Sequence, residues 1–391
     1  MTHTAVPADT QRSGRHRHSS SRSTIRIAAL AVALAAALVL VVVTLKQPKR
    51  GGPAPSASAT GPVTLAKAWP GAAVAEAPGQ LADGTPFSPW VYLDLRTAVG
   101  TAPTSDGLAE RLLLRSGAVE PRELHRVPKD RNPQWAGFAV SGDDLVWAES
   151  TVSADGKGET RLWRTSWRTE GPAVDLTADT GDIVFFNSQY DLVIADGAVH
   201  WAAAARTETP TTELRSVPLA GGAVTVKQVP GAYALSAWPW LVSVGNGQAG
   251  PVDLRNVSTG AQVKVSASAT EMLRCSPVWC RVQVMSGTGA MARVDLMRLD
   301  GSDRRRVSGG DADPAIMDVA LGDRFEVFSM DSSAGSPTSS QQVLLYDATA
   351  KRMVVVGTEA GTILARGIVI WWSTGENEVL VWHALDLTTL K

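Results

Sequence analysis

The feature that most constrains the fold of this chain is a pair of strand-like segments that recurs between residues 88 and 391. The first member of each pair is a turn followed by an apolar, often aromatic run. Such runs, bounded by Gly, Asp, Pro and Ser, are typical of short β-strands. The seven first members are SPWVYLDL (88–95), GDDLVWAE (142–149), DGAVHWAA (196–203), AWPWLVSV (237–244), SPVWCRVQV (276–284), GDRFEVFS (322–329) and RGIVIWWS (366–373).

The second member of each pair fixes the spacing of the repeat. Alignment of these segments places seven apolar residues at equivalent positions: Leu114, Leu162, Leu214, Leu254, Leu296, Leu345 and Val381. Their mean spacing of about 44 residues lies within the ~40–50 residues of a four-stranded propeller blade. We therefore predict an all-β fold for residues 63–391, a single seven-bladed β-propeller. Six or eight blades are the alternatives, because the first unit, 70–128, is long and irregular at TAVGTAPTSDG.

The two ends of the predicted domain are expected to pair with each other. The last repeat ends at Lys391 without room for an outer strand, and PVTLAKAW (62–69) could supply one. A ring closed in this way leaves no open sheet edge for other chains to pair with. We therefore predict that residues 62–69 complete the seventh blade.

One repeat also resembles a known family. LDGSDRRRVSGGDADP (299–314) resembles the Asp-Gly-Ser…Arg-Arg-Leu-Thr turn of TolB-type, WD40-like propeller repeats, and the other six units match only in strand pattern. The chain is also similar to membrane-anchored propellers of actinobacteria. The resemblance implies a β-propeller and no particular activity. The matching positions are Leu299, Asp300, Gly301, Ser302, Arg305, Arg306, Val307 and Ser308.

A long apolar segment precedes the repeats. IAALAVALAAALVLVVVTL (27–45) has neither a charge nor a proline. As a helix it would span nearly all of the ~30 Å hydrocarbon core of a bilayer. A cleaved signal peptide needs only about 7–15 apolar residues, and the small-residue site SASAT (56–60) lies well beyond the apolar run. We predict an uncleaved, single-pass transmembrane helix (a signal anchor) that binds the chain to the cell membrane.

The charges on either side of this segment predict its orientation. Residues 1–26 form an Arg/Ser/His-rich tail with five arginines, whereas residues 46–62 form a Pro/Gly/Ser/Ala linker with three basic residues. The positive-inside rule then makes the tail cytoplasmic and residues 63–391 extracytoplasmic. The formal net charge of −1 gives no overall field that favours nucleic acid. We expect no nucleic-acid partner.

The only two cysteines are Cys275 and Cys280, in EMLRCSPVWCRVQV (271–284). They lie at the end of one predicted strand and the start of the next, with Ser276 and Pro277 in the turn. Outside the membrane a disulfide is the expected state. A zinc site needs about four ligands, and a redox pair is more often C-x-x-C. We predict a structural disulfide.

Other motifs fall short of a cofactor or metal site. VGNGQAG (244–250) has G-x-G-x-x-G spacing, but a strand follows it instead of the helix that a dinucleotide site requires, so we interpret it as a hairpin turn. GGDADPA (309–315) and TADTGD (177–182) lack a complete calcium-ligand series and are interpreted as solvated turns. We predict no cofactor and no metal.

Catalysis has no local signature in the sequence. H-E-x-x-H and G-x-S-x-G are both missing. The histidines of the predicted domain, His125, His200 and His383, are interpreted as core or flank residues, and no catalytic residue is assigned.

The tryptophans could suggest carbohydrate binding. Most occupy repeated strand positions, where large aromatic rings fill the space between blades. Among Trp238, Trp240, Trp371 and Trp372, only Trp238, just before Pro239, is expected in a loop.

These observations predict a non-catalytic binding or scaffold module for a protein partner or an envelope ligand, which binds at one face of the ring. The alternative is a propeller hydrolase or lyase that acts on a cell-envelope polymer through a site assembled from distant loops. A sensor that signals through residues 27–45 is a further alternative. The cytoplasmic tail argues against it, because it is too short to fold into a signalling domain.

Overall fold

The computed structural model describes residues 63–153, 155–244, 249–332 and 340–391. Residues 62–391 form one compact unit. The predicted tail (1–26), transmembrane helix (27–45) and linker (46–62) lie outside the described residues. Within the described part of the chain, no helix is long and apolar enough to cross a membrane.

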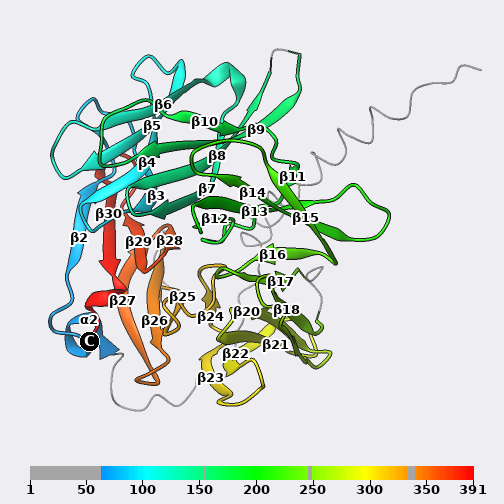
Figure 1. The fold of residues 1–391 in the computed structure, drawn as a ribbon. Coiled ribbons are helices and arrows are strands. Elements are labelled where there is room, and N and C mark those ends of the chain that lie inside the picture. The colour runs from blue at the N-terminus through cyan, green and yellow to red at the C-terminus, as the bar shows by residue number, and fades with distance from the viewer. Residues whose placement is uncertain (1–62, 154, 245–248, 333–339) are drawn as a thin grey trace, which may run out of the picture. The chain divides into compact units, whose positions relative to one another are not determined.

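Seven sheets of mainly antiparallel strands form the blades of a β-propeller (Figure 1). Blade 1 contains β3 (Ser88–Tyr92), β4 (Thr97–Pro103), β5 (Ala109–Ser116) and β6 (Arg122–Pro128). Blade 2 contains β7 (Gln134–Ser141), β8 (Asp144–Val152), β9 (Gly158–Ser166) and β10 (Val174–Thr177). Blade 3 contains β11 (Asp182–Ile183), β12 (Leu192–Ala195), β13 (Ala198–Ala204), β14 (Thr211–Pro218) and β15 (Thr225–Pro230).

The remaining four blades follow in chain order. Blade 4 contains β16 (Tyr233–Leu235), β17 (Trp240–Ser243), β18 (Val252–Asn256) and β19 (Gln262–Val265). Blade 5 contains β20 (Glu271–Cys275), β21 (Trp279–Met285), β22 (Met291–Arg298) and β23 (Arg305–Gly309). Blade 6 contains β24 (Ala312–Pro314), β25 (Phe325–Asp331), β26 (Gln341–Asp347), β27 (Arg352–Ala360) and β1 (Val63–Thr64). Blade 7 contains β28 (Ile363–Arg366), β29 (Val369–Thr374), β30 (Val381–Asp386) and β2 (Val74–Pro78).

The helices of the described chain are single turns that lie between strands or, in one case, follow the last strand. They are α2 (Leu65–Ala68), η1 (Lys129–Arg131), η2 (Asn377–Val379) and η3 (Leu387–Thr389). Most strand connections are tight, and the Asp196–Gly197 turn between β12 and β13 is an example. Both residues have positive φ, 51° and 74°, as a two-residue type I′ hairpin turn requires.

The core is divided into seven apolar clusters, and each cluster joins two consecutive blades. Blades 1 and 2, for example, meet through Leu112 and Trp147, which are fully buried. The last cluster joins blade 7 to blade 1 through Trp371 and Leu113. Because this contact returns to the first blade, the ring is closed, and the prediction of seven blades is confirmed.

The segment that closes the ring differs from the predicted one. β2 is antiparallel to β30, with Val74 opposite Leu385 and Pro78 opposite Val381, and Figure 1 shows β2 in blue beside β30 in red. The prediction that residues 62–69 complete blade 7 is therefore wrong. β1 instead pairs in parallel with β27 of blade 6. Its strand lasts only two residues because α2 follows at once and turns the chain towards blade 7.

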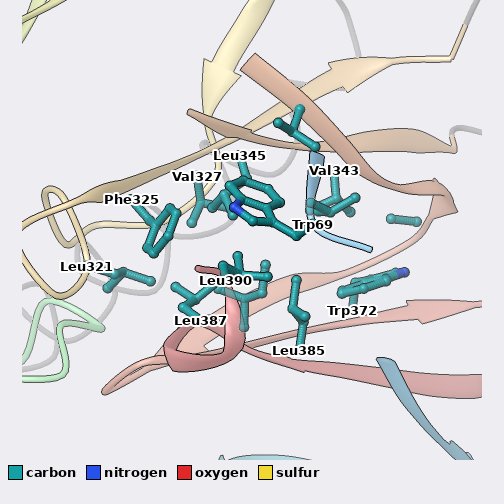
Figure 2. Close-up of a cluster of buried hydrophobic side chains, with 14 residues drawn as sticks. Trp69, Leu321, Phe325, Val327, Val343, Leu345, Trp372, Leu385, Leu387 and Leu390 are labelled. Atoms are coloured by element: carbon teal, nitrogen blue, oxygen red, sulfur yellow. The ribbon is translucent and has the colours of Figure 1, made fainter. Parts of the chain in front are cut away.

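Trp69 anchors this N-terminal segment between blades 6 and 7. Its side chain is 2% exposed and meets Phe325 edge-on, at 6.0 Å between ring centroids. Figure 2 shows the indole beside Val327 and Leu345, with Leu390 on its other side. The segment therefore stabilises the ring mainly through this buried side chain.

The predicted strand pairs correspond to the second and third strands of blades 2 to 7, whereas in blade 1 only the second member of the pair does, as the third strand β5. There SPWVYLDL contains the innermost strand, β3, and the second strand is β4 (TAVGTAP), within the stretch that is irregular in sequence. The small residues of β4 leave room for the ring of Phe87. A Cβ added at Gly100 would clash with this ring and with the Ser88 carbonyl. β4 therefore lacks the aromatic residues that mark its counterparts.

Cys275 and Cys280 are joined in a disulfide, as predicted. They lie directly opposite each other at the ends of β20 and β21, with 4.1 Å between their Cα atoms. Both are buried among the apolar residues that join blades 4 and 5. The disulfide therefore ties an inner hairpin of the ring.

Candidate functional site

The innermost strand of blade 3 is interrupted. β11 and β12 both pair with β13, since Ile183 lies opposite Ala203 and Leu192 lies opposite Trp201. The Val184 amide donates to the Ala202 carbonyl oxygen, so residues 185–191 form an excursion from a nearly continuous strand edge. We call residues 185–191 the crossing loop.

The crossing loop contacts blade 6, which is not a neighbour of blade 3. The Ser188 hydroxyl donates to Asp318 at 2.6 Å, and the Gln189 amide donates to the other oxygen of that carboxylate at 3.0 Å. Asp318 is buried in the connection between β24 and β25. Since the two blades are not adjacent and both Asp318 and Asp191 of the loop are buried, the loop crosses the interior of the ring.

Blade 7 also meets the crossing loop. The Gly367 amide donates to Gln189 Oε1 at 2.9 Å, and Arg366 donates to the Phe138 carbonyl oxygen of blade 2. Burial lowers the pKa of Arg366, while Asp191 and Asp318 raise it. A cation and two carboxylates therefore occupy the interior of the ring.

Asp191 closes the crossing loop on itself. Its carboxylate is 6% exposed and accepts hydrogen bonds from the Phe186 and Ser188 amides, at 2.9 and 3.2 Å. Burial raises the pKa of Asp191 to about 6, against the opposing effect of these amides and of Arg366. Asp318 adds to the increase because it is a second carboxylate nearby.

A buried ion pair joins blades 5 and 6 next to Asp318. Arg281 of β21 donates to Glu326 of β25, and its guanidinium also donates to the carbonyl oxygens of Ile316 and Asp318. The second oxygen of Glu326 accepts the Ala320 amide at 2.7 Å. The pair thus fixes residues 316–320, from which Asp318 reaches the crossing loop.

Beside the crossing loop lies a cavity of ≈ 140 Å³, which we call the ring cavity. Its wall comes from blades 3, 4, 5 and 6, presents polar and apolar surface in similar amounts, and includes the Asp318 carboxylate, which is already bonded to the crossing loop. The lining includes Phe186, Tyr190, Met272, Met317, Ser188 and Ser243. This volume suits a small ligand or one group of a larger ligand.

Arg274 is the one basic residue that lines the ring cavity among the described residues. Its guanidinium makes no hydrogen bond or ion pair with any described residue, unlike those of Arg281 and Arg366. Burial within the ring lowers the pKa of Arg274, Arg281 lowers it further and Asp318 raises it. The residue is nevertheless exposed, so the desolvation of its guanidinium is partial. Arg274 therefore offers free donors to an anionic group.

The three histidines stay apart from the ring cavity. His125 pairs with Glu149 at 3.0 Å between blades 1 and 2, against the ring of Trp163. His200 stacks on Trp238, and burial lowers the pKa of its imidazole. His383 accepts from or donates to Thr374 at 2.8 Å. The geometry does not bring any of them to Asp191 or Asp318.

The predicted turn motifs have structural roles where they are described. Asp179 and Asp182 of TADTGD form ion pairs with Arg215 and Arg206, at 2.7 and 2.8 Å. Residues 309–315 contain the end of β23 and the whole of β24, whereas 245–248 of VGNGQAG lie outside the described residues. Within the described part, no three His, Cys, Asp or Glu side chains come together as metal ligands.

Comparisons with known proteins give a likeness of fold alone. No family model and no curated protein matches the chain. A puromycin-hydrolyzing peptidase from Mycobacterium tuberculosis is 15% identical, over 84% of this chain and 54% of that one, with a TM-score of 0.46. TolB from Acinetobacter baumannii is 12% identical over 73% of this chain and 78% of its own, with a TM-score of 0.36. A putative TolB from Agrobacterium tumefaciens is 14% identical over 68% and 93%, also with a TM-score of 0.36.

Proposed function

We propose that this chain is a non-catalytic binding module that holds an anionic group of a protein partner or envelope ligand in the ring cavity. The observation that carries the proposal is Arg274, a cation in the cavity wall without a hydrogen-bonding partner among the described residues. A guanidinium binds carboxylates through two parallel hydrogen bonds, and partial desolvation strengthens such contacts. Phe186, Tyr190 and Met272 provide apolar surface for the rest of the ligand.

The interior carboxylates already accept hydrogen bonds from the protein, which favours a binding function over catalysis. Asp191 and Asp318 each accept two hydrogen bonds from the crossing loop, and Glu326 accepts from Arg281 and a backbone amide. A general acid or base needs a carboxylate free to exchange a proton with the ligand. The hydrolase or lyase acting on an envelope polymer remains the alternative function.

The location of the module is part of the proposal. Residues 27–45 would anchor the chain in the cell membrane and residues 46–62 would act as a spacer, with the propeller outside the cell. Such tethering raises the effective concentration of the binding site near the membrane.

The test is affinity capture from detergent-solubilised envelope with the full chain, read by mass spectrometry. We expect a near-stoichiometric partner whose capture falls about tenfold or more in Arg274→Gln, since a charged hydrogen-bonding pair is lost. Arg306→Gln is the matched control, because Arg306 is exposed on β23 and outside the cavity. Equal capture by the two variants would refute the role of Arg274, and turnover of an envelope polymer by the wild type would favour the enzyme.

A further inference from the structure

A second depression lies between blades 1 and 2, away from the ring cavity. Its volume is ≈ 370 Å³, within the range of ~300–1,000 Å³ common for small-molecule sites. We call it the blade 1–2 groove. Its lining includes Trp90, Glu110, Lys129, Asn132, Gln134 and Trp135.

Trp90 gives the groove a fixed aromatic wall. Its ring stacks on Phe138, with 5.7 Å between centroids and 22° between planes. Its indole N–H donates to Thr101 Oγ1 at 3.3 Å. Because the polar edge of the indole is already bonded, the ring offers a ligand apolar aromatic surface and no further donor.

Glu110 places a partly buried carboxylate in the same groove. Its side chain is 22% exposed and accepts no hydrogen bond from any described residue. Lys129 lies 4.0 Å away, too far for a hydrogen bond but close enough to balance the charge. Burial raises the pKa of Glu110, against the opposing charges of Lys129 and Arg111. The groove is therefore close to neutral and contains an acceptor that lacks a donor.

The remaining polar atoms come from the connection between β6 and β7 and from the first residue of β7, Gln134. The Gln134 side chain donates to the Pro133 carbonyl oxygen at 2.9 Å, which holds its amide in place and leaves Oε1 as an acceptor. Asn132 has φ of 46° at the end of η1, and its amide N–H is bonded to the Lys129 carbonyl oxygen. The groove thus combines positioned acceptors and donors beside the aromatic side chains of Trp90 and Trp135.

These properties select among ligand classes. An anion would be repelled by Glu110, and an apolar ligand would cover this carboxylate without giving it a donor, which costs about 1–3 kcal/mol or more. A simple cation would compete with Lys129 for the same carboxylate. A neutral ligand with several hydroxyl groups and one apolar face can donate to Glu110 and Gln134, accept from Lys129 and lie against Trp90.

We propose that the blade 1–2 groove binds a neutral saccharide, whose apolar ring face lies against Trp90 and whose hydroxyl groups bond to Glu110, Gln134 and Lys129. This site is separate from the ring cavity, and it goes beyond the function proposed above. It does not depend on Arg274.

The test is saturation-transfer NMR on the full chain in detergent with four neutral probes: cellotriose, maltotriose, mannotriose and N,N′,N″-triacetylchitotriose. We expect at least one probe to bind at millimolar concentration. Glu110→Gln and Gln134→Ala should each weaken this binding by about tenfold, since the first replaces one acceptor oxygen of a partly buried carboxylate by an NH2 group and the second removes the amide acceptor. Both positions are near the surface, so the fold should survive the changes. Trp90→Ala should abolish binding, with the melting temperature as a check on its fold.

Two control variants test whether the loss of saccharide binding is specific to the blade 1–2 groove. Glu120→Gln makes the same chemical change at an exposed turn between β5 and β6 and should leave binding unchanged. Arg274→Gln should also leave it unchanged, which separates this proposal from the ring cavity. Failure of all four probes to bind would overturn the proposal. So would binding that is insensitive to both Glu110→Gln and Gln134→Ala, or binding of tetramethylammonium in place of the saccharides.

Discussion

Trp69→Ala tests whether the segment before blade 1 is part of the propeller core. The indole is 2% exposed, meets Phe325 edge-on and lies under the Arg352 guanidinium at 5.0 Å from the ring centroid. Truncation of a buried Trp to Ala costs about 3–5 kcal/mol. With an unfolding entropy of about 2.1 cal/mol/K per residue, a domain of this size should lose roughly 6 °C in melting temperature.

The assay is differential scanning calorimetry of the full chain, with chemical denaturation as a second measure. The matched control is Trp167→Ala, because Trp167 is only partly buried at the edge of the cluster that joins blades 1 and 2, where Arg168 covers its ring. We expect the control to lose clearly less stability than Trp69→Ala, since less apolar surface leaves the core. If Trp69→Ala lowers the melting temperature no more than Trp167→Ala does, Trp69 does not join blades 6 and 7, and the reasoning is refuted.

Three further changes test the interior of the ring. Burial raises the pKa of Asp191 to about 6 from its ordinary 3.8, so the folded state binds more protons than the unfolded state in this range, and stability should fall as pH rises from about 4 to 6. Asp191→Asn should flatten that part of the melting-temperature profile relative to the wild type. Arg281→Met alone should cost about 3–5 kcal/mol because it leaves Glu326 buried without its cation, and adding Glu326→Leu should recover part of the loss in urea titrations. Loss of the disulfide in Cys275→Ala/Cys280→Ala should cost about 2 kcal/mol on the chain-entropy model, and a reducing agent should then lower the melting temperature of the wild type alone.

The sequence predicts best the strands that lie between two neighbouring blades. The second and third strands of blades 2 to 7 have apolar and aromatic residues, such as Trp201 and Leu345, because they pack against an adjacent sheet. The disulfide was also predictable, since the two cysteines lie on either side of a short turn. β4 has no recognisable strand pattern, because the core beside Gly100 is filled by Phe87, which is not part of that strand.

The same sequence patterns could not predict the closing strand β2 or the contacts inside the ring. β2 (VAEAP) is only half buried, so it lacks a strong apolar signature. The crossing loop depends on a contact between Ser188 and Asp318, 130 residues apart. Nothing local distinguishes these two residues from ordinary turn residues. Arg274 likewise has no local signature in the sequence, because its place in a cavity depends on four different blades.

This contrast has a physical cause that bears on function. A strand packed between blades must satisfy the same packing in every repeat, so its pattern recurs and can be recognised. The innermost strands face the channel instead and are free to depart from the repeat, as β11 and β12 do around the crossing loop. Arg274 and the crossing loop both belong to this free inner layer. The departures from the repeat are therefore the positions at which a rigid ring can acquire a specific ligand, and substitutions there should change binding more than stability.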